Sequence, residues 1–362
     1  MSLKVLFLSN MYPNKKNPSW GIFVQENEKQ LLEMGYDLDK VVVSKEDNSI
    51  VKAYSYIKYC WQVFDKIARN KYKFIYIHYL TYTTIPIFIY SLFSNLNFYI
   101  NIHGDDLVGK KLTHKIMSLS NGFLLKRAKG IIVPSHYFQE ILLNKYSFLS
   151  KSNIHINYSG GIDTEKFTSF TSPDKKKDFV FISRISEGKG IEFLLKTILN
   201  MKKNLLLPPD VRFHIYGTGN LDNKVKCYIQ EEKLESYVFF HGELKPTDVP
   251  RVMSQSRFFI FPTERESLGL VLLESLSCGT PVICSKIRPL SDYAQNITNN
   301  SSFPIFYFDL NSGKDLQDKI LNLHNYELNS YVHLVQAAKN LATNYSRSMS
   351  TKNLENFLKE RD

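Results

Sequence analysis

Residues 259–283 read FIFPTERESLGLVLLESLSCGTPVI, and this stretch decides the fold of the second half of the chain. An apolar run that ends at Pro262 predicts a buried strand, and a polar loop and a helical segment from Leu268 to Ser277 follow it. A second apolar run, Pro281–Cys284, comes soon after the helix. Strand, loop, helix and strand in this order are typical of a parallel sheet.

The same alternation continues outward through the chain. The predicted strands are Lys4–Ser9, Val41–Val43, Phe74–His78, Tyr99–His103, Gly130–Pro134, Phe179–Ile182, Arg212–Tyr216, Val238–Phe240, Phe258–Phe261 and Pro281–Cys284. The predicted helices include Trp20–Met34, Ile191–Asn200, Asp222–Lys233, Leu268–Ser277 and Ser350–Lys359. The sequence therefore predicts an α/β fold of doubly wound parallel sheets.

The length of 362 residues suits two domains. The segment Phe167–Lys177 is polar, contains Pro173 and has no periodicity, which indicates a linker. We expect two Rossmann-like domains facing each other across a cleft, over residues 1–168 and 174–345. The C-terminal helix, 346–362, is expected to pack back on the first domain.

Composition excludes several classes of protein. Hydrophobic residues make up 43% and charged residues 22%, which is typical of a globular chain. The four cysteines have no CxxC spacing, so neither a zinc site nor a disulfide framework is expected, and a cytoplasmic protein is favoured. Tyr79–Ile100 is uncharged, but Pro86 and polar residues interrupt it. It predicts a buried helix and a strand, with a membrane span as the alternative.

The net charge of +11 is uneven, because residues 1–170 hold 21 Lys/Arg and 13 Asp/Glu. We expect this half to meet an anionic partner such as a phospholipid surface, a lipid phosphate or nucleic acid. No nucleic-acid-binding signature is present, so nucleic acid is not favoured. Lys110–Lys129 predicts either a basic helix lying peripherally on the cytoplasmic face of a membrane or a core-facing helix. Interfacial or core aromatic residues could add to it, namely Tyr54, Tyr56, Tyr59 and Trp61.

Polar residues after two strands of the second half point to a phosphate. Arg184 and Lys189 lie between a strand and the start of a helix, where two cations suit a diphosphate, although a solvated turn is the alternative. Gly217 and Gly219 follow the next strand, where they predict either close backbone approach to a ligand or a plain tight turn.

Two glutamates frame the helix in the opening stretch. Glu266 precedes the helix, and Glu274 lies eight residues further, near two helical turns, so both can share one face. Carboxylates accept hydrogen bonds from vicinal hydroxyls, which suits a sugar and a ribose, while a solvated Glu274 is the alternative. Free backbone N–H groups where the helix starts would bind a phosphate. The residues there are Ser267, Leu268, Gly269 and Leu270.

The segment Phe261–Ile283 resembles the signature of glycosyltransferase family 4, retaining enzymes with the GT-B fold among the glycosyl transferases group 1. That signature is a glutamate, seven residues and a second glutamate, followed by Cys-Gly-Thr-Pro-Val. Ser183–Gly190 resembles the phosphate-binding turn of the family, and Gly161–Phe167 resembles its interdomain hinge. Ile215–Gly219 and Phe240–Gly242 resemble its intervening strand ends.

The resemblance implies a retaining, metal-independent glycosyltransferase (a hexosyltransferase) that uses a UDP-, GDP- or other nucleoside diphosphate sugar. The acceptor would be a saccharide or a lipid-linked molecule, in bacterial capsule, O-antigen or exopolysaccharide assembly. Arg184 and Lys189 would neutralise the leaving diphosphate. Glu266 would contact the transferred sugar, and Glu274 would bind the ribose hydroxyls.

In the first domain, which would hold the acceptor, the resemblance implies two further residues. His103 matches the active-site histidine, and Gly21 matches the loop glycine beside the donor phosphate. Asp105 and Asp106, which follow His103, are candidates for acceptor binding or for capping a helix.

Other functions fit parts of the pattern. A metal-dependent transferase would use Asp37-Leu38-Asp39, but this motif precedes the second strand and is expected to form a turn. A sugar-nucleotide epimerase or a phosphorylase could use the same two-domain plan. A non-catalytic sugar-nucleotide-binding subunit is a further alternative.

Overall fold

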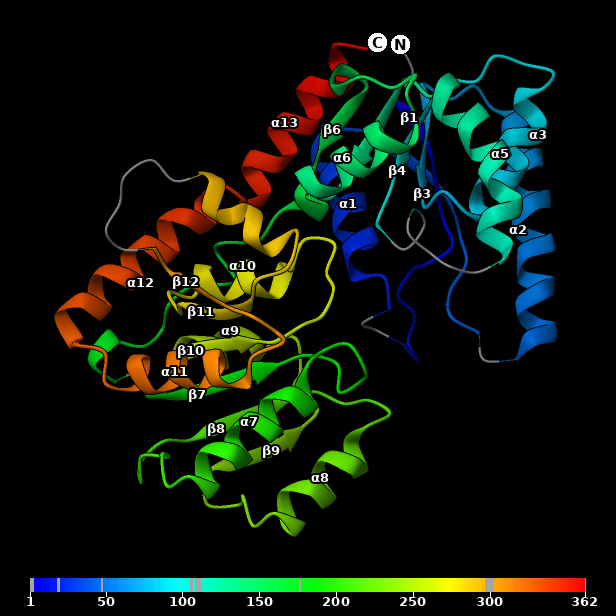
Figure 1. Cartoon of the computed structure of the whole chain (residues 1–362). Coiled ribbons are helices and arrows are strands. Elements are labelled where there is room, and N and C mark those ends of the chain that lie inside the picture. Colours follow the sequence, from blue (N-terminus) through cyan, green and yellow to red (C-terminus); the bar gives the residue numbers. More distant parts are fainter. Residues whose placement is uncertain are drawn as a thin grey trace. The chain divides into compact units, whose positions relative to one another are not determined.

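The computed structural model describes residues 3–17, 20–46, 48–104, 107, 112–175, 177–296 and 303–361. The chain divides into two compact units, residues 1–161 with 347–362 and residues 162–346 (Figure 1). Each unit contains a parallel sheet, which among the described residues has six strands.

The first unit has the strand order β2-β1-β3-β4-β5-β6. Its strands are β1 (Lys4–Ser9), β2 (Asp37–Val42), β3 (Phe74–His78), β4 (Phe98–Asn101), β5 (Gly130–Val133) and β6 (Ile154–Ile156). Its helices are α1 (Ile22–Glu33), α2 (Ser49–Arg69), α3 (Ile85–Ser91), α5 (Leu112–Arg127), α6 (His136–Lys145) and α13 (Arg347–Lys359).

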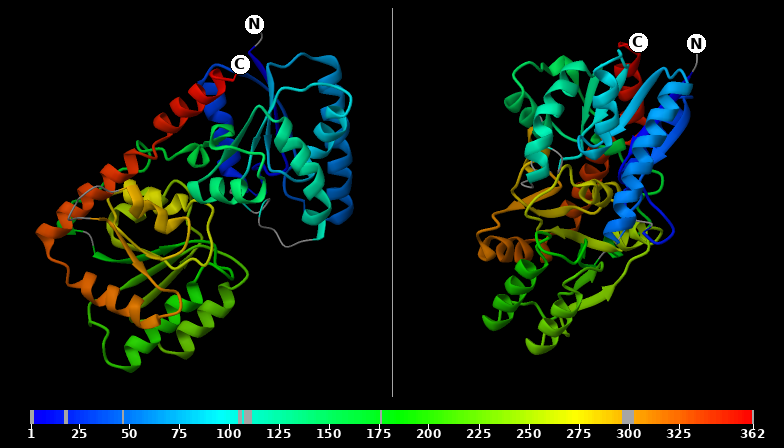
Figure 2. Two further views of the ribbon diagram at one scale, coloured as in Figure 1. Left: turned by 45° about the horizontal axis from the view of Figure 1, so that its top comes forward. Right: turned by 90° about the vertical axis from the view of Figure 1, so that its right-hand side faces the viewer.

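Alternation along β1 builds two cores in this unit, because successive strand residues point to opposite faces. Leu6 and Leu8 join a cluster with residues of α2, α3, α5 and α6. Val5 and Phe7 join a cluster with residues of α1 and α13. The helices α2, α3 and α5 therefore cover one face of the first sheet, as Figures 1 and 2 also show.

The second unit has the strand order β12-β11-β10-β7-β8-β9. Its strands are β7 (Lys177–Ile182), β8 (Phe213–Tyr216), β9 (Val238–Gly242), β10 (Ser256–Phe261), β11 (Val282–Ser285) and β12 (Ile305–Phe308). Its helices are α7 (Ile191–Lys203), α8 (Asp222–Glu231), α9 (Val249–Gln255), α10 (Leu270–Ser277), α11 (Gly313–His324) and α12 (Leu328–Thr343).

Both sheets have a point where the strand order reverses. In the second unit the chain runs from β7 outward to β9 and then returns with β10 on the other side of β7. In the first unit, β2 lies on one side of β1 and β3 on the other. Open parallel sheets bind ligands beyond the carboxyl ends of the strands at such a point. The predicted α/β class with two doubly wound parallel sheets is confirmed.

Three details differ from the sequence predictions. Asp37-Leu38-Asp39 forms the start of β2 rather than a turn, since an edge strand tolerates polar residues, and Asp39 accepts a hydrogen bond from the Tyr72 hydroxyl at 2.6 Å. The predicted helix within Tyr79–Ile100 is present as α3, but it is not fully buried, because Ile89 is exposed. The short edge strands β6 and β12 were not predicted.

The boundary between the units also differs. Residues 162–168, which we assigned to the first domain, lie in the second unit. Ile162 forms a parallel bridge with Ser346, and its N–H donates to the carbonyl of Tyr345 at 2.9 Å. The helix α13 lies in the first unit, where the Ser350 hydroxyl donates to the Asn157 carbonyl at 2.7 Å.

Candidate active site

Two predicted site residues meet at the strand-order reversal of the second unit. Lys189 lies in the loop after β7, and Glu266 lies in the loop after the neighbouring strand β10. Lys189 Nζ donates to Glu266 Oε1 at 2.5 Å. A cation and a carboxylate therefore lie together where an open parallel sheet binds its ligand.

The loops that carry this ion pair are tied to each other by backbone and hydroxyl groups. The N–H of Glu264 donates to the carbonyl of Gly188 at 2.9 Å. The Thr263 hydroxyl lies 3.3 Å from Glu266 Oε1, and the Thr263 carbonyl accepts from Ser285 Oγ at 2.5 Å. The Lys189 bond is to Oε1, and Oε2 of Glu266 has no partner among the described residues, so Oε2 is available to a ligand.

Glycines set the starts of the two helices behind these loops. Gly190 has φ of 77° and Gly269 has φ of 85°, and each directly precedes its helix, α7 or α10. A side chain at Gly190 would place Cβ 1.8 Å from the carbonyl oxygen of Pro262. The turn before α7 therefore requires glycine both for its backbone angle and for its contact with the β10 loop.

The start of α10 presents backbone N–H groups. The N–H of Leu272 is bonded to the carbonyl of Gly269 at 2.9 Å, while earlier amides of the helix have no acceptor within it. Leu268 is buried, and its carbonyl accepts from the Tyr293 hydroxyl at 2.9 Å, which fixes the approach to the helix. The amide of Leu270 therefore lies where an anion is stabilised by a helix N-terminus. Ser267 precedes this turn in the same loop.

Arg184 lies two residues beyond the end of β7, on the same loop as Lys189. Its side chain is exposed, and its guanidinium makes no ion pair or hydrogen bond to any residue that the structure describes. It is therefore a cation available to a ligand beside the ion pair.

Glu274 lies one helical turn after Leu270 in α10. Its carboxylate is partly exposed and has no hydrogen-bond partner within the described ranges. Burial raises the pKa of Glu274 from its ordinary 4.5 to about 7, against the opposing effect of the Lys166 charge. The structure brings Lys189 and Glu266 into contact, whereas Glu274 is a separate, underpartnered acid.

Chain packing explains why glycine occupies positions 217 and 219 after β8. A Cβ on Gly217 would lie 1.8 Å from the carbonyl oxygen of Ser183, and one on Gly219 would lie 2.1 Å from that of Ile185. Glycine at both positions lets the β8 loop pack on the β7 loop. Close chain packing thus explains these glycines without a ligand, and a role in donor binding stays a prediction.

Two histidines meet at the carboxyl edge of the first sheet. His78 ends β3, and His103 follows β4 by two residues. His78 Nδ1 lies 2.8 Å from His103 Nε2, and the two rings stack with centroids 5.1 Å apart. Burial lowers the pKa of His103 to about 3, and burial together with His103 lowers the pKa of His78 well below its usual range. Both rings are neutral at pH 7, so one nitrogen donates to the other.

Sequence reasoning missed His78, although a polar residue at the end of the strand next to the one before His103 was a usable signal. The His103 ring also contacts Phe23 and Tyr79, each with a centroid distance of 4.7 Å. Aromatic rings around His103 exclude water and favour the neutral imidazole.

The other residues predicted in the first domain fall in different places. Gly21, with φ of 82°, directly precedes α1, and a Cβ there would lie 2.9 Å from Met11. Asp105 and Asp106 lie outside the described residues. Within Lys110–Lys129, the structure describes the backbone from Leu112, as α5, and the side chains from Ser120.

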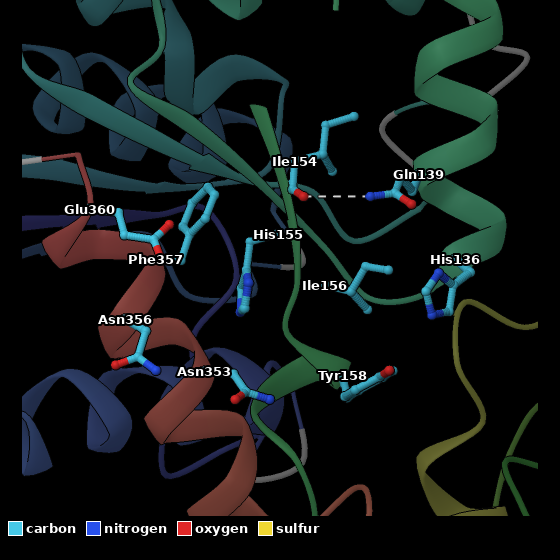
Figure 3. Close-up of a pocket in the computed structure, with 10 residues that line it drawn as sticks. All are labelled: His136, Gln139, Ile154, His155, Ile156, Tyr158, Asn353, Asn356, Phe357 and Glu360. Carbon is cyan, nitrogen blue, oxygen red and sulfur yellow. Dashed lines mark hydrogen bonds between the residues drawn. The ribbon is translucent and has the colours of Figure 1, made fainter. Parts of the chain in front are cut away.

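A hollow of about 450 Å³ lies at the β6 edge of the first sheet (Figure 3). Residues from α6, β6 and α13 line it, including His136, His155 and Asn356. His155 stacks on Phe357 there, with ring centroids 4.9 Å apart. None of the predicted site residues lines this hollow, so it is separate from the strand-end residues.

Within the described ranges, no group of three or more His, Cys, Asp or Glu side chains is placed to hold a metal ion. None of the described helices combines the length and the apolar character that a membrane crossing requires.

The chain matches the family model of glycosyl transferases group 1 over residues 163–343, which is half of its length. The protein therefore belongs to the family of glycosyl transferases group 1.

Individual relatives are similar over parts of the chain. The alpha-monoglucosyldiacylglycerol synthase of Streptococcus pneumoniae is 26% identical over 204 residues, which cover 52% of this chain and 44% of that protein. The O-antigen chain mannosyltransferase B of Escherichia coli is 34% identical over 115 residues, 31% of this chain and 29% of the relative. The chain thus spans less than half the length of either relative.

Solved structures resemble the whole chain. HepE of Anabaena, in complex with UDP, has a TM-score of 0.73 at 16% identity and covers 99% of this chain and 100% of its own. Sucrose-phosphate synthase of Thermosynechococcus elongatus has a TM-score of 0.75 at 14% identity, covering 99% and 98%. This likeness shows the fold, and the predicted GT-B fold is confirmed.

Proposed function

We propose that this protein transfers a sugar, with retention of anomeric configuration and without a metal ion, from a nucleoside diphosphate sugar to a saccharide or lipid-linked acceptor. The observation that carries the proposal is the contact of Lys189 with Glu266 at the strand-order reversal of the second unit. In this proposal the cation binds the diphosphate and the carboxylate binds the sugar, and their contact at 2.5 Å supports a shared site.

The chemistry that these residues supply is stabilisation of the leaving group. When the glycosidic bond to the diphosphate breaks, negative charge develops on the phosphate oxygens. Arg184 and Lys189 provide positive charge, and the amide of Leu270 adds the N-terminal end of α10. A fixed set of donors stabilises this charge without reorganising, which is why we propose that no metal is needed.

The two carboxylates then accept hydrogen bonds from hydroxyl groups of the donor. Oε1 of Glu266 accepts a hydrogen bond from Lys189, and Oε2 accepts one from a sugar hydroxyl. Glu274, one turn further along α10, accepts from the ribose hydroxyls. In the first unit, His103 contributes a neutral imidazole, which His78 orients through the Nδ1 to Nε2 contact.

The process proposed for this enzyme is assembly of a bacterial cell-surface polysaccharide such as capsule, O-antigen or exopolysaccharide. A relative named O-antigen chain mannosyltransferase B supports this assignment. A relative named alpha-monoglucosyldiacylglycerol synthase supports a lipid-linked acceptor. HepE and the Staphylococcus aureus protein TarM have each been solved with UDP, which supports UDP as the nucleotide.

A thermal-shift series with UDP, GDP and their sugars tests donor binding, because a ligand that binds only the folded state raises the melting temperature. We expect one nucleotide to stabilise the wild type and Lys189→Ala to lose most of that gain. Lys196→Ala, which removes an exposed lysine of α7, is the matched control. A gain that survives Lys189→Ala unchanged would overturn the assignment.

Product analysis tests the reaction itself. With the bound donor and candidate acceptors, we expect a new glycoside with the anomeric configuration of the donor, formed equally with and without EDTA. Conversion of the sugar nucleotide to an isomeric sugar nucleotide without any acceptor would instead indicate an epimerase.

A further inference from the structure

The helix α2 exposes a continuous apolar stripe. Ile50 is 80% exposed, Tyr54 66%, Ile57 69% and Trp61 66%. Their spacings of four, three and four residues place all four on one side of the helix. Large apolar side chains gathered on one exposed face, rather than scattered singly, indicate an interaction surface.

This stripe is not a core face left open. The core-facing side of α2 carries Tyr59 and Val63, which are fully buried against the first sheet. At 100° per residue, the stripe lies on the opposite side of the helix from these two residues. The helix is therefore apolar on two opposite faces, and packing within the chain explains only one of them.

The neighbouring helix α3 continues the same feature. Ile85, Ile89, Leu92 and Phe93 are exposed, Phe93 to 84%, while Ile87 is fully buried in the same cluster as Tyr59. Since α2 and α3 pack on one face of the sheet, their exposed sides both point away from it (Figures 1 and 2). We name these eight residues the α2–α3 surface: Ile50, Tyr54, Ile57, Trp61, Ile85, Ile89, Leu92 and Phe93.

Positive charge borders the α2–α3 surface. Residues 48–104 contain six Lys or Arg and one acid, Asp65, which pairs with Arg69 at 2.6 Å. Lys58 on α2 lies next to the stripe, is exposed and makes no ion pair among the described residues. At the end of α5, Arg127 donates to the Asn95 side chain at 2.6 Å, which places a further cation two residues from Phe93.

We propose that the α2–α3 surface binds an anionic phospholipid bilayer. The isoleucines, Leu92 and Phe93 enter the boundary between headgroups and acyl chains, and Tyr54 and Trp61 lie at the headgroup level, which such rings prefer. Lys58 and Arg127 contact lipid phosphates. Tyr54 and Trp61 were expected only to add to a membrane contact of Lys110–Lys129, whereas this assignment makes α2 and α3 its centre.

A bilayer fits this surface better than a second copy of the chain. A two-fold contact through α2 would bring the same patch against itself, and with it the unpaired Lys58 of both copies. An anionic lipid surface instead complements those charges. A lipid-linked acceptor, which rests on the proposed function, would be within reach of a first unit held in this way, but the lipid contact itself does not depend on transferase activity.

Vesicle binding of the full chain tests the proposal. We expect sedimentation with vesicles of phosphatidylcholine and phosphatidylglycerol at 70:30, and at least ten-fold weaker partitioning to phosphatidylcholine alone. Ile57→Ser with Trp61→Ser, and separately Phe93→Ser, should each lower partitioning at least ten-fold. Leu205→Ser, which removes a leucine of the second unit that is 93% exposed, is the control and should leave partitioning unchanged.

A spectroscopic readout reports the site directly. Trp20 and Trp61 are the two tryptophans of the chain, so the Trp20→Phe protein reports on Trp61 alone. We expect its emission to shift to the blue with anionic vesicles. Equal binding by the serine variants, or unchanged Trp61 emission on bound protein, would overturn the proposal. So would a concentration-dependent dimer that Ile57→Ser with Trp61→Ser dissociates, because it would identify a second copy as the occupant.

The proposed nucleotide binding and the proposed membrane binding can be tested independently of each other. Lys189→Ala should bind vesicles like the wild type while losing nucleotide stabilisation. Ile57→Ser with Trp61→Ser should keep the melting-temperature gain with nucleotide, which also shows that this variant is folded. Loss of both properties in either variant would contradict the independence of the two surfaces.

Discussion

Replacing Glu274 with glutamine should make the protein more stable and a poorer nucleotide binder. The carboxylate of Glu274 sits among buried neighbours of α10, and burial raises its pKa to about 7. Between pH 4.5 and 7 the folded protein holds a proton on this group that the unfolded chain releases. The free energy of unfolding therefore falls as pH rises through this window, and the full cost is present above pH 7.

The size of the effect follows from the two pKa values. The interval from 4.5 to about 7 corresponds to roughly 3 kcal/mol at 1.36 kcal/mol for each tenfold change. The side chain is partly exposed, so solvent screening reduces this to about 1–2 kcal/mol. For a unit of this size, that corresponds to a melting temperature about 2–8 °C higher for Glu274→Gln at pH 8.

Calorimetry at pH 5 and pH 8, with and without UDP, measures both properties. The stability difference between Glu274→Gln and the wild type should be present at pH 8 and nearly absent at pH 5. A lost charge-assisted hydrogen bond to ribose, worth about 1.5–3 kcal/mol, should weaken UDP binding about 10- to 100-fold. Wild-type affinity for UDP should rise from pH 6 to pH 8 as Glu274 ionises.

The control is Glu235→Gln, which neutralises an exposed carboxylate of the same unit and should change neither property. If Glu274→Gln melts like the wild type at pH 8, burial does not hold Glu274 near its neutral form. If its UDP affinity is unchanged, Glu274 does not bind the ribose.

Three further predictions concern the strand-end residues. Lys189→Ala should lower kcat/KM about 10²- to 10³-fold in a transfer assay, and Lys189→Arg should lower it less, because the charge that faces the diphosphate is kept. Gly190→Ala should destabilise the protein by at least about 2 kcal/mol in urea unfolding, since Cβ would lie 1.8 Å from the Pro262 carbonyl at a φ of 77°. His78→Phe should lower kcat more than it raises KM, with His78→Asn restoring part of the rate. Equal activity of both His78 variants would show that His103 needs no orienting partner.

The strands could be predicted from the sequence because parallel strands that are buried on both faces are short apolar runs bounded by turns. Residues 259–283 therefore predicted β10, α10 and β11, with boundaries that differ by one or two residues. Edge strands carry a weaker signal, because one side has no partner. That is why β6 and β12 were missed and why Asp37–Val42 was recognised only at its apolar end.

The sequence predicted which residues belong to the candidate site, but it did not predict which of them are in contact. Lys189 and Glu266 are 77 positions apart, and only the pairing of β7 with β10 makes them neighbours. His78 and His103 meet because β3 and β4 are adjacent, which no local pattern indicates.

The sequence by itself determined the alternation of strands and helices, the glycines before α7 and α10, and the acids and cations that follow the strands, since each is a local preference of a residue type. The tertiary structure decided which loops meet, and it decided which side of α2 the core covers. Helical spacing alone does not tell whether Tyr59 or Trp61 faces the core. The periodicity shows that a face of the helix is apolar, but it does not show what packs on that face. Only the packing of Tyr59 and Val63 on the first sheet leaves Trp61 on the outside.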